Sequence, residues 1–394
     1  MKKYFCIFGG GGIRGVAYAG ALRSLIEQGV QIVGLAGSSV GAVFSSLYVA
    51  GYSCDELEDI FINLKMDIFK DINFNFGKDF ALSKGDAFYA WIRDLIESKF
   101  YGENYEKGKM EPVKFKDIEH NYIVLSTNLT DSTYKEFSKH TTPDAEVAHA
   151  VRASVSMPGL FRPVYQDGEI IVDGDLMKSW PLWRLSPSLC PPDARIMEFR
   201  LEDLQQNKLI DNSLAYLNAV YNTISSFATD FIIDLYKERD KFDYIKINSP
   251  DISVLDFAIN QNKKRELIDI GYEATSSYFK YFLPQKRKKL LDNYYEIFLI
   301  LQKIRHELRE SSDIKSAYAI LCELFMHLCE YKRYIDLDIY EKIDAFKNLF
   351  KRNYKISKFF FISGYTLNDK TLVLIELQKI MEIIDSKTAE LRDN

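Results

Sequence analysis

The sequence has little cysteine and no long apolar run, and each shortage excludes certain kinds of protein or site. Its five cysteines among 394 residues are odd in number and lack the spacing of metal or redox sites, which favours packed thiols in a reducing compartment. No apolar run approaches the roughly 18 residues of a membrane span. The apolar run at residues 4–8 ends at Gly9 and is too short for a signal peptide, whose apolar region has about 7 to 15 residues. We therefore expect a cytoplasmic protein, with peripheral membrane attachment or export without a classical signal peptide as the alternatives.

Charge of one sign is not in large excess either. The 51 basic and 56 acidic side chains leave a net charge of -5, so no nucleic acid binding is expected. Glycine is scarce at one end of the chain: after Pro284 it occurs once, at Gly364, while Leu, Ile, Lys, Glu and Tyr recur at helical spacing. This change predicts two domains, residues 1–283 and an all-helical C-terminal domain of residues 284–394.

Histidine offers no obvious catalytic base. A hydrolase with the chain order Ser, Asp or Glu, His would need a histidine late in its α/β domain. Three of the five histidines precede the acidic turn described below, and two lie in the expected helical domain: His120, His140, His149, His306 and His327. We interpret all five as surface or packed histidines.

Glycine is concentrated near the start of the chain. Residues 4–8 are a continuous apolar run, which predicts a strand buried on both faces, and four glycines follow at residues 9–12. The loop lacks the Gly-Lys-Ser/Thr of a phosphate-binding P-loop, and no acidic residue ends the next strand as a dinucleotide site would require. Two interpretations remain. The loop is either a tight turn without a ligand, or a set of backbone N–H groups that hold an oxyanion, and we favour the second because a turn does not need four glycines.

A second pair of glycines flanks a serine. Residues 37–41 read Gly-Ser-Ser-Val-Gly, after the apolar run 32–36 and before an apolar helix start. A G-x-S-x-G pattern between a strand and a helix is typical of a nucleophile elbow, in which the glycines prevent a Cβ from colliding with neighbouring backbone. Ser39 is therefore the candidate nucleophile. A five-residue pattern also arises by chance, so its weight depends on the residues around it.

Together these two glycine motifs resemble those of the patatin-like phospholipase family. Residues 10–15, Gly-Gly-Gly-Ile-Arg-Gly, precede the serine motif by one βα unit, as in that family. The family's third mark is an Asp-Gly-Gly or Asp-Gly-Ala turn, which residues 173–175, Asp-Gly-Asp, match except at the last position. Residues 153–163 and 256–274 resemble two further family segments, so the resemblance covers residues 4–280. It implies a three-layer α/β fold with a central, mainly parallel sheet.

The resemblance also implies an activity. It indicates a serine esterase, a lipid acyl hydrolase of phospholipase A or lysophospholipase type, that needs no metal or cofactor and forms an acyl-serine. Asp173 would take the proton of Ser39 directly, Asp175 would be a secondary carboxylate, and the N–H groups of Gly10, Gly11 and Gly12 would hold the oxyanion. A carboxylate near its ordinary pKa of about 3.9 is a weak base. We therefore expect apolar surroundings and repulsion from Asp175 to raise the pKa of Asp173.

Several expectations about partners follow from the resemblance. The substrate would be a phospholipid or another acyl-ester lipid, reached by peripheral membrane contact. Bacterial members of the family often carry an added domain that keeps them inactive, so we expect a protein or small-molecule activator to act through the C-terminal domain. The alternative is a catalytically silent interaction module with the same fold.

Three features stay open at this stage. Arg14 either holds a lipid phosphate or pairs with a carboxylate at the start of its helix. The aromatic-rich stretch 70–85 is a candidate for a lid or a membrane-contacting edge, and the apolar residues 359–362 are a candidate for contact with a membrane or a partner. Core packing is the preferred interpretation of both stretches.

Overall fold

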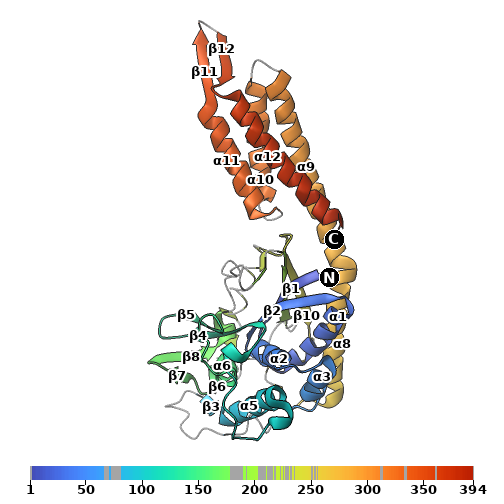
Figure 1. Cartoon of the computed structure of the whole chain (residues 1–394), viewed down its shortest axis with the longest axis vertical. Coiled ribbons are helices and arrows are strands. Elements are labelled where there is room, and N and C mark those ends of the chain that lie inside the picture. Colours follow the sequence, from blue (N-terminus) through green and yellow to red (C-terminus); the bar gives the residue numbers. More distant parts are fainter. Residues whose placement is uncertain are drawn as a thin grey trace. The chain divides into compact units, whose positions relative to one another are not determined.

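A computed structural model describes most of the chain. It covers residues 2–65, 71, 81–177, 190, 191, 193–202, 210, 237–249, 252, 254, 256–310, 314–331, 335–359 and 362–393, with part of 216–236. The chain divides into two compact units: a first unit of Met1–Asp234 with Lys241–Lys280, and a second unit of Leu235–Asp240 with Tyr281–Asn394 (Figure 1). The domain boundary after residue 283 stays a prediction, because a division by packing does not show that either part folds alone.

The first unit is built on a central sheet, for which the described residues supply eight strands (Figure 1). The strand order is β10-β9-β1-β2-β4-β8-β7, with β5 paired to β4. The five strands from β10 to β4 are parallel, whereas β5, β7 and β8 pair in antiparallel fashion, so the predicted mainly parallel sheet is confirmed. The strands are β1 (Lys2–Phe8), β2 (Val30–Ser38), β4 (Asn121–Asn128), β5 (Thr133–Ser138), β7 (Val164–Gln166), β8 (Glu169–Asp173), β9 (Arg195–Glu202) and β10 (Phe242–Asn248). A separate parallel pair joins β3 (Ala81–Ser83) to β6 (Gly159–Phe161).

The central strand β1 is buried on both faces, as its apolar run predicts. Tyr4, Phe5, Cys6 and Phe8 are fully buried. Phe8 stacks on Phe199 of the neighbouring strand β9, with ring centroids 4.9 Å apart. This packing fixes the end of β1, from which the glycine loop starts.

Helices connect and cover these strands. They are α1 (Ala17–Glu27), α2 (Val40–Val49), α3 (Cys54–Ile62), α5 (Asp86–Tyr101), α6 (Val147–Ser154) and α8 (Gln261–Ser277), and the short 3-10 turns η1 (Gly12–Val16) and η5 (Gly174–Met177) lie at the site described below. Local chemistry sets where they begin. Ser53 caps α3, because its hydroxyl accepts the Glu56 N–H at 3.3 Å while the Glu56 carboxylate accepts the Ser53 N–H at 2.8 Å.

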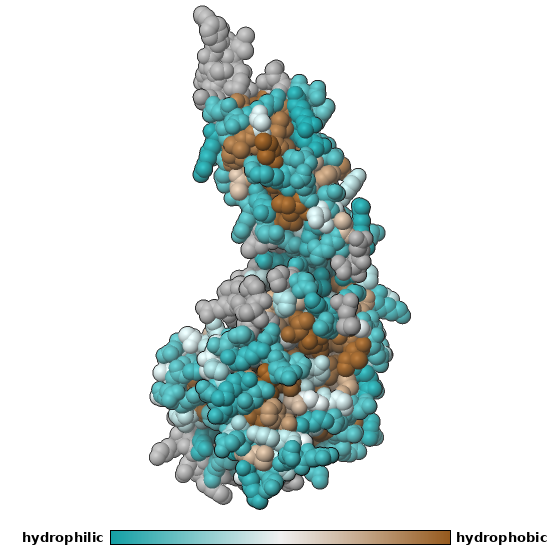
Figure 2. All heavy atoms as spheres, viewed as in Figure 1, coloured by the Kyte–Doolittle hydropathy of each residue, from teal (hydrophilic) through white to brown (hydrophobic). Residues whose placement is uncertain are grey.

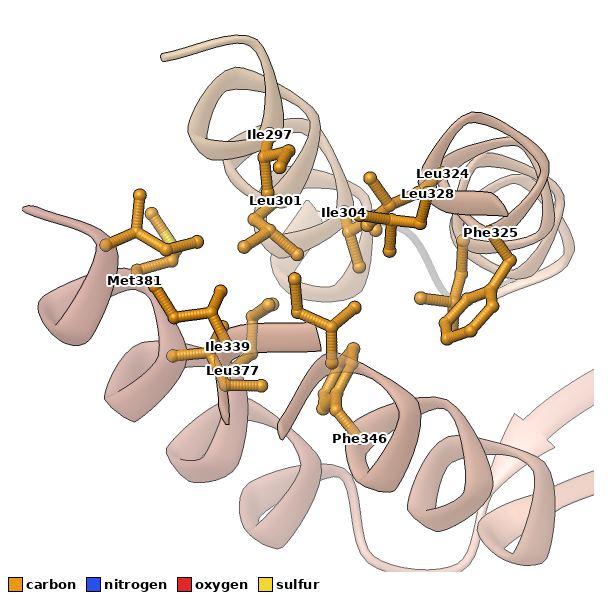
Figure 3. Close-up of a cluster of buried hydrophobic side chains, with 14 of the residues drawn as sticks. Ile297, Leu301, Ile304, Leu324, Phe325, Leu328, Ile339, Phe346, Leu377 and Met381 are labelled. Carbon is orange, nitrogen blue, oxygen red and sulfur yellow. The ribbon is translucent and has the colours of Figure 1, made fainter. Parts of the chain in front are cut away.

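The second unit consists mainly of helices. They are α9 (Leu283–Glu310), α10 (Lys315–Tyr331), α11 (Leu337–Asn353) and α12 (Lys370–Asp393). Leu301, Ile304, Phe346 and Leu377 point toward one another from three of these helices and belong to a continuous buried apolar cluster (Figure 3). The helical spacing noted after Pro284 is that of their buried faces.

One part of the second unit departs from the all-helical prediction. Strands β11 (Tyr354–Phe359) and β12 (Ile362–Leu367) form an antiparallel hairpin between α11 and α12. Helical periodicity is counted over long windows, and a hairpin of this length is lost between two long amphipathic helices. Residues 360 and 361, in the proposed membrane-contacting stretch, lie outside the described residues, as does most of the stretch 70–85.

Polar side chains cover most of the visible face of each unit, with apolar side chains between them (Figure 2). Among the helices that the structure describes, none combines the length and the apolar character needed to span a bilayer.

Candidate active site

Ser39 lies at a sharp turn between strand β2 and helix α2. The strand ends at Ser38, the helix begins at Val40, and Ser39 between them has a φ of 52° and a ψ of -126°. A Cβ on Gly41 would lie 1.9 Å from the carbonyl oxygen of Phe8, so this position accepts glycine alone without backbone movement. The turn has the strand–turn–helix form that the G-x-S-x-G pattern predicts.

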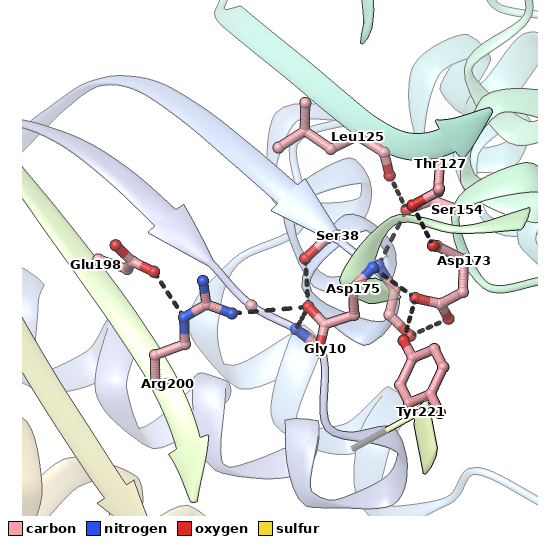
Figure 4. A network of polar contacts seen from close by, with 12 residues as sticks. Gly10, Ser38, Leu125, Thr127, Ser154, Asp173, Asp175, Glu198, Arg200 and Tyr221 are labelled. Atoms are coloured by element: carbon pink, nitrogen blue, oxygen red, sulfur yellow. Dashed lines mark hydrogen bonds and ion pairs between the residues drawn. The ribbon is translucent and has the colours of Figure 1, made fainter. Parts of the chain in front are cut away.

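The hydroxyl of Ser39 is directed at an aspartate. Ser39 Oγ donates a hydrogen bond to Asp173 Oδ2 at 2.7 Å. Asp173 is the last residue of strand β8. The other oxygen, Oδ1, accepts the Asp175 N–H at 2.8 Å and the Tyr221 hydroxyl at 2.9 Å (Figure 4). The structure therefore brings the two predicted residues together and adds a tyrosine from a segment 48 residues further along the chain.

The surroundings of Asp173 favour its neutral form. Its side chain is 1% exposed, and burial, followed by the negative charge of Asp175, raises its pKa from the ordinary value to about 7. The N–H of Asp175 and the hydroxyls of Ser39 and Tyr221 act in the opposite direction, because each donates to the carboxylate. The result is a carboxylate that is ionised in part near neutral pH and is much more basic than an exposed one.

The second aspartate of the turn has different partners. Asp175 Oδ1 accepts the Gly10 N–H and the Ser38 hydroxyl, each at 2.8 Å, and lies 3.7 Å from Arg200 Nη1 (Figure 4). Arg200 in turn donates from Nε to Glu198 at 2.6 Å. The Gly10 N–H is thus directed at a carboxylate, which separates it from the other two glycines predicted to hold an oxyanion.

Gly11 and Gly12 differ from Gly10 in this respect. All three glycines line the cavity in front of Ser39, but the described residues supply no acceptor for the N–H groups of Gly11 and Gly12. Gly12 has a φ of 59°, and a Cβ there would lie 1.9 Å from the Val254 carbonyl oxygen. Glycine is therefore required by both the conformation and the space at this position.

Two further hydroxyls hold the backbone on either side of the Ser39–Asp173 contact. Ser154 Oγ accepts the Ser39 N–H at 2.9 Å and donates to the Leu125 carbonyl at 2.5 Å (Figure 4). Thr127 Oγ1 donates to the Asp173 carbonyl at 2.9 Å. Ser154 belongs to α6, and Leu125 and Thr127 belong to β4. The elbow is therefore held by α6, which is itself bonded to β4, and the aspartate is held by β4.

A cavity of about 90 Å³ opens in front of Ser39 and is lined mainly by apolar side chains. Its polar lining includes Ser39, Asp173 and Tyr221, and no histidine of the described chain lines it. Arg14 also lines it, with its Nε 3.4 Å from the Gly11 carbonyl oxygen, and a role for Arg14 in phosphate binding stays a prediction. Within the described ranges, no cluster of three or more His, Cys, Asp and Glu side chains is suited to hold a metal ion.

Comparison with known proteins shows which family the part of the chain that carries this site resembles. Residues 6–184, which carry the elbow and the aspartate turn, match the model of the patatin-like phospholipase family. Over these residues the chain is similar to the patatin-like phospholipase family. The predicted resemblance to this family and the predicted α/β fold are thereby confirmed.

Individual relatives are distant. The uncharacterized protein YqhO of Bacillus subtilis (strain 168) is 27% identical over 298 residues, which cover 70% of this chain and 97% of YqhO. Lysophospholipase NTE1 of Mycosarcoma maydis is 27% identical over 179 residues, 45% of this chain but 8% of that much longer relative. The crystal structure of VipD from Legionella pneumophila shares the fold, with a TM-score of 0.52 at 14% identity over 99% of this chain and 88% of VipD. The patatin-like phospholipase match and the lysophospholipase relative support lipid hydrolase activity at the level of the family.

Inspection of the sequence missed some residues at this site. Glu198 and Arg200 could have been found from the sequence, because opposite charges two positions apart in the largely apolar stretch 196–201 would share one face of a strand and would need partners there. Tyr221 could not have been found in this way. Its helix could be recognised from hydropathy, but nothing local to Tyr221 indicated that its hydroxyl reaches Asp173.

Proposed function

We propose that the chain is a lipid acyl hydrolase of phospholipase A or lysophospholipase type, with Ser39 as nucleophile and Asp173 as base. The observation that carries this proposal is the 2.7 Å hydrogen bond from Ser39 Oγ to Asp173 Oδ2 at the wall of an apolar cavity. A base at this distance can take the hydroxyl proton directly. The raised pKa of Asp173, about 7, suits a base that works near neutral pH.

The proton has one clear destination in this arrangement. Asp173 Oδ1 already accepts two donors, so Oδ2 takes the proton while Ser39 Oγ bonds to the carbonyl carbon of the ester. The tetrahedral intermediate then collapses, the lipid alcohol leaves with that proton, and an acyl-serine remains. Water attacks the acyl-serine with Asp173 again as base, which releases the fatty acid and restores the Ser39 hydroxyl.

The remaining parts of the cavity suit the same reaction. The N–H groups of Gly11 and Gly12 are the proposed donors to the oxyanion of each tetrahedral intermediate. Phe61, Phe88 and Trp91 are among the side chains that would contact the acyl chain, since an apolar lining with a few polar groups at one end fits such a ligand.

The activity can be tested with two variants and a control. Wild type, Ser39→Ala and Asp173→Asn would be compared for fatty-acid release from phospholipid vesicles and lysophospholipid micelles, with the products identified by mass spectrometry. We expect each variant to lose at least about 1,000-fold in rate. Asp144→Asn, the same chemical change on the exposed surface, should match wild type. Equal rates for wild type and Ser39→Ala would refute hydrolysis by this site, and the absence of any release would favour the silent interaction module.

We also propose that the substrate is reached by peripheral contact with a membrane and that the second unit regulates hydrolysis in response to a protein or small-molecule activator. The supporting observations are the match of residues 6–184 to the patatin-like phospholipase family and the separate apolar core of the second unit. Regulation would be refuted by a chain ending at residue 283 that stays folded and keeps both its basal and its stimulated rate. A cytoplasmic location, with export as the alternative, is checked by fractionation of the producing cell.

A further inference from the structure

The carboxylate of Asp175 takes no part in the proposed proton transfer. The residue is nevertheless buried, with 3% of its surface exposed, and its carboxylate accepts hydrogen bonds. Its Oδ1 accepts from Gly10 in the glycine loop and from Ser38 in the elbow strand, and its own N–H donates to Asp173 Oδ1. One residue thus joins the glycine loop, the elbow and the proposed base (Figure 4). The turn resembles a family motif that carries glycine or alanine at this position, so these contacts belong to this chain's own aspartate.

The negative charge of Asp175 is balanced by an arginine of strand β9. Arg200 Nη1 lies 3.7 Å from Asp175 Oδ1, and both side chains are almost completely buried. Arg200 also donates to Glu198 on the same face of β9. A buried carboxylate without a cationic partner would be costly, so Arg200 is the group that allows a second negative charge beside Asp173.

The glycine loop is shaped around this pair. A Cβ on Gly9 would lie 2.8 Å from Arg200 Nη1, and a Cβ on Gly10 would lie 2.5 Å from Asp175 Oδ2. Gly9 and Gly10 therefore make room for Arg200 and Asp175. Gly10, Gly11 and Gly12 line the cavity.

We propose that Asp175 and Arg200 form a positioning pair, in which Asp175 holds the glycine loop against the elbow and orients the Asp173 carboxylate, and Arg200 supplies the counter-charge. The proposal rests on the hydrolase function proposed above. It assigns to Asp175 and Arg200 a role in the reaction that is exerted through Gly10, Ser38 and Asp173.

The charges near the two carboxylates set the direction of the expected effects. Besides Arg200 and Glu198, Tyr221 interacts with both carboxylates and Tyr18 interacts with Asp175, while Arg14 acts on Tyr18. Removing the charge of Asp175 takes a like charge away from Asp173, so the pKa of Asp173 falls. Removing Arg200 takes a cation away from Asp175 and Glu198. We therefore expect the pKa of Asp173 to rise.

The test measures the pH dependence of Ser39 labelling by a fluorophosphonate, in the full chain. Asp175→Asn should move the acid limb of the labelling rate to lower pH, and Arg200→Gln should move it to higher pH, each by about one unit. Asp175→Ala, which also removes the acceptor for Gly10 and Ser38, should lower the maximum rate by about a hundredfold. Arg195→Gln is the matched control, because Arg195 lies on the same strand as Arg200, β9, and pairs with the buried Asp243 of β10 at 2.7 Å. This variant should lose stability without moving the acid limb.

Thermal unfolding supplies a second measurement that needs no activity. Arg200→Gln should lower the melting temperature, and the double variant Asp175→Asn/Arg200→Gln should recover part of that loss, because only Glu198, and no longer Asp175, then carries a buried negative charge that has lost Arg200. The proposed positioning pair would be refuted if the acid limbs of the two single variants stayed in place or moved in the same direction. It would also be refuted if the double variant were no more stable than Arg200→Gln. Failure of the hydrolase proposal is distinguishable, since wild type would then remain unlabelled at every pH while the unfolding measurements still decide whether the pair is coupled.

Discussion

Changing Tyr221 to phenylalanine removes one hydroxyl from the proposed base and keeps the aromatic ring. In the wild-type chain this hydroxyl donates to Asp173 Oδ1 at 2.9 Å. The bond favours the ionised carboxylate and so holds the pKa of Asp173 down, against the larger upward effects of burial and of Asp175. Tyr221→Phe should therefore raise the pKa of Asp173 above its value of about 7.

The size of the effect follows from the strength of such a bond. A hydrogen bond to a charged group contributes about 1.5 to 3 kcal/mol, which corresponds to about one to two pKa units at 1.36 kcal/mol per unit. Asp173 is a base only when ionised, so the acid limb of the reaction should move up to about pH 8 or 9. At pH 7 the ionised fraction would fall from about one half to about one tenth or less, and the rate would fall about fivefold or more. Well above the new pKa the variant should react as fast as wild type.

The assay is the rate of Ser39 labelling by a fluorophosphonate between pH 5 and pH 10, in steps of about half a unit. Tyr216→Phe is the matched control, because Tyr216 lies on the same segment with 60% of its surface exposed, and its profile should superimpose on that of wild type. A Tyr221→Phe profile lowered by one constant factor at every pH would mean that the tyrosine merely supports the fold. An unmoved acid limb would refute the assignment of that limb to Asp173.

Two further predictions concern stability. Gly41→Ala should lower the free energy of unfolding by about 2 kcal/mol or more, measured by urea denaturation, because its Cβ would lie 1.9 Å from the Phe8 carbonyl oxygen; an unchanged midpoint would contradict this account of the elbow glycine. Lys387→Met should destabilise the second unit by about 3 kcal/mol or more, because Lys387 is 9% exposed and supplies a cation to two carboxylates, Asp240 at 2.6 Å and Asp336 at 3.1 Å. A melting curve equal to that of wild type would show that solvent reaches this cluster.

Much of the fold could be predicted because its signals are local. The apolar run at residues 4–8 and the glycines at residues 9–12 specify a buried strand and a loop without reference to the rest of the chain. The elbow at Ser39 is equally local, since the spacing of its glycines reflects collisions with adjacent backbone. The position of Asp173 followed from a motif after a recognisable strand.

The parts that could not be predicted depend on how distant elements meet. The hydrogen bond from Tyr221 to Asp173 requires the placement of a helix that a hydropathy pattern cannot orient. The use of the Gly10 N–H by Asp175 depends on the closeness of the aspartate turn to the loop after β1, and no local pattern encodes that distance. The hairpin β11–β12 escaped because the helices on either side of it dominate the periodicity.

The backbone of Ser39 has a consequence for how this chain can change. A φ of 52° at a residue with a side chain is strained, at a cost of about 1 to 3 kcal/mol, and glycine would adopt the same conformation with little strain. Stability therefore favours glycine at position 39, whereas the proposed reaction requires serine there. A variant that exchanged its nucleophile for glycine would gain stability in the step that ended its activity, so inactive descendants of this chain should be easy to reach, well folded and hard to distinguish from the active form by stability alone.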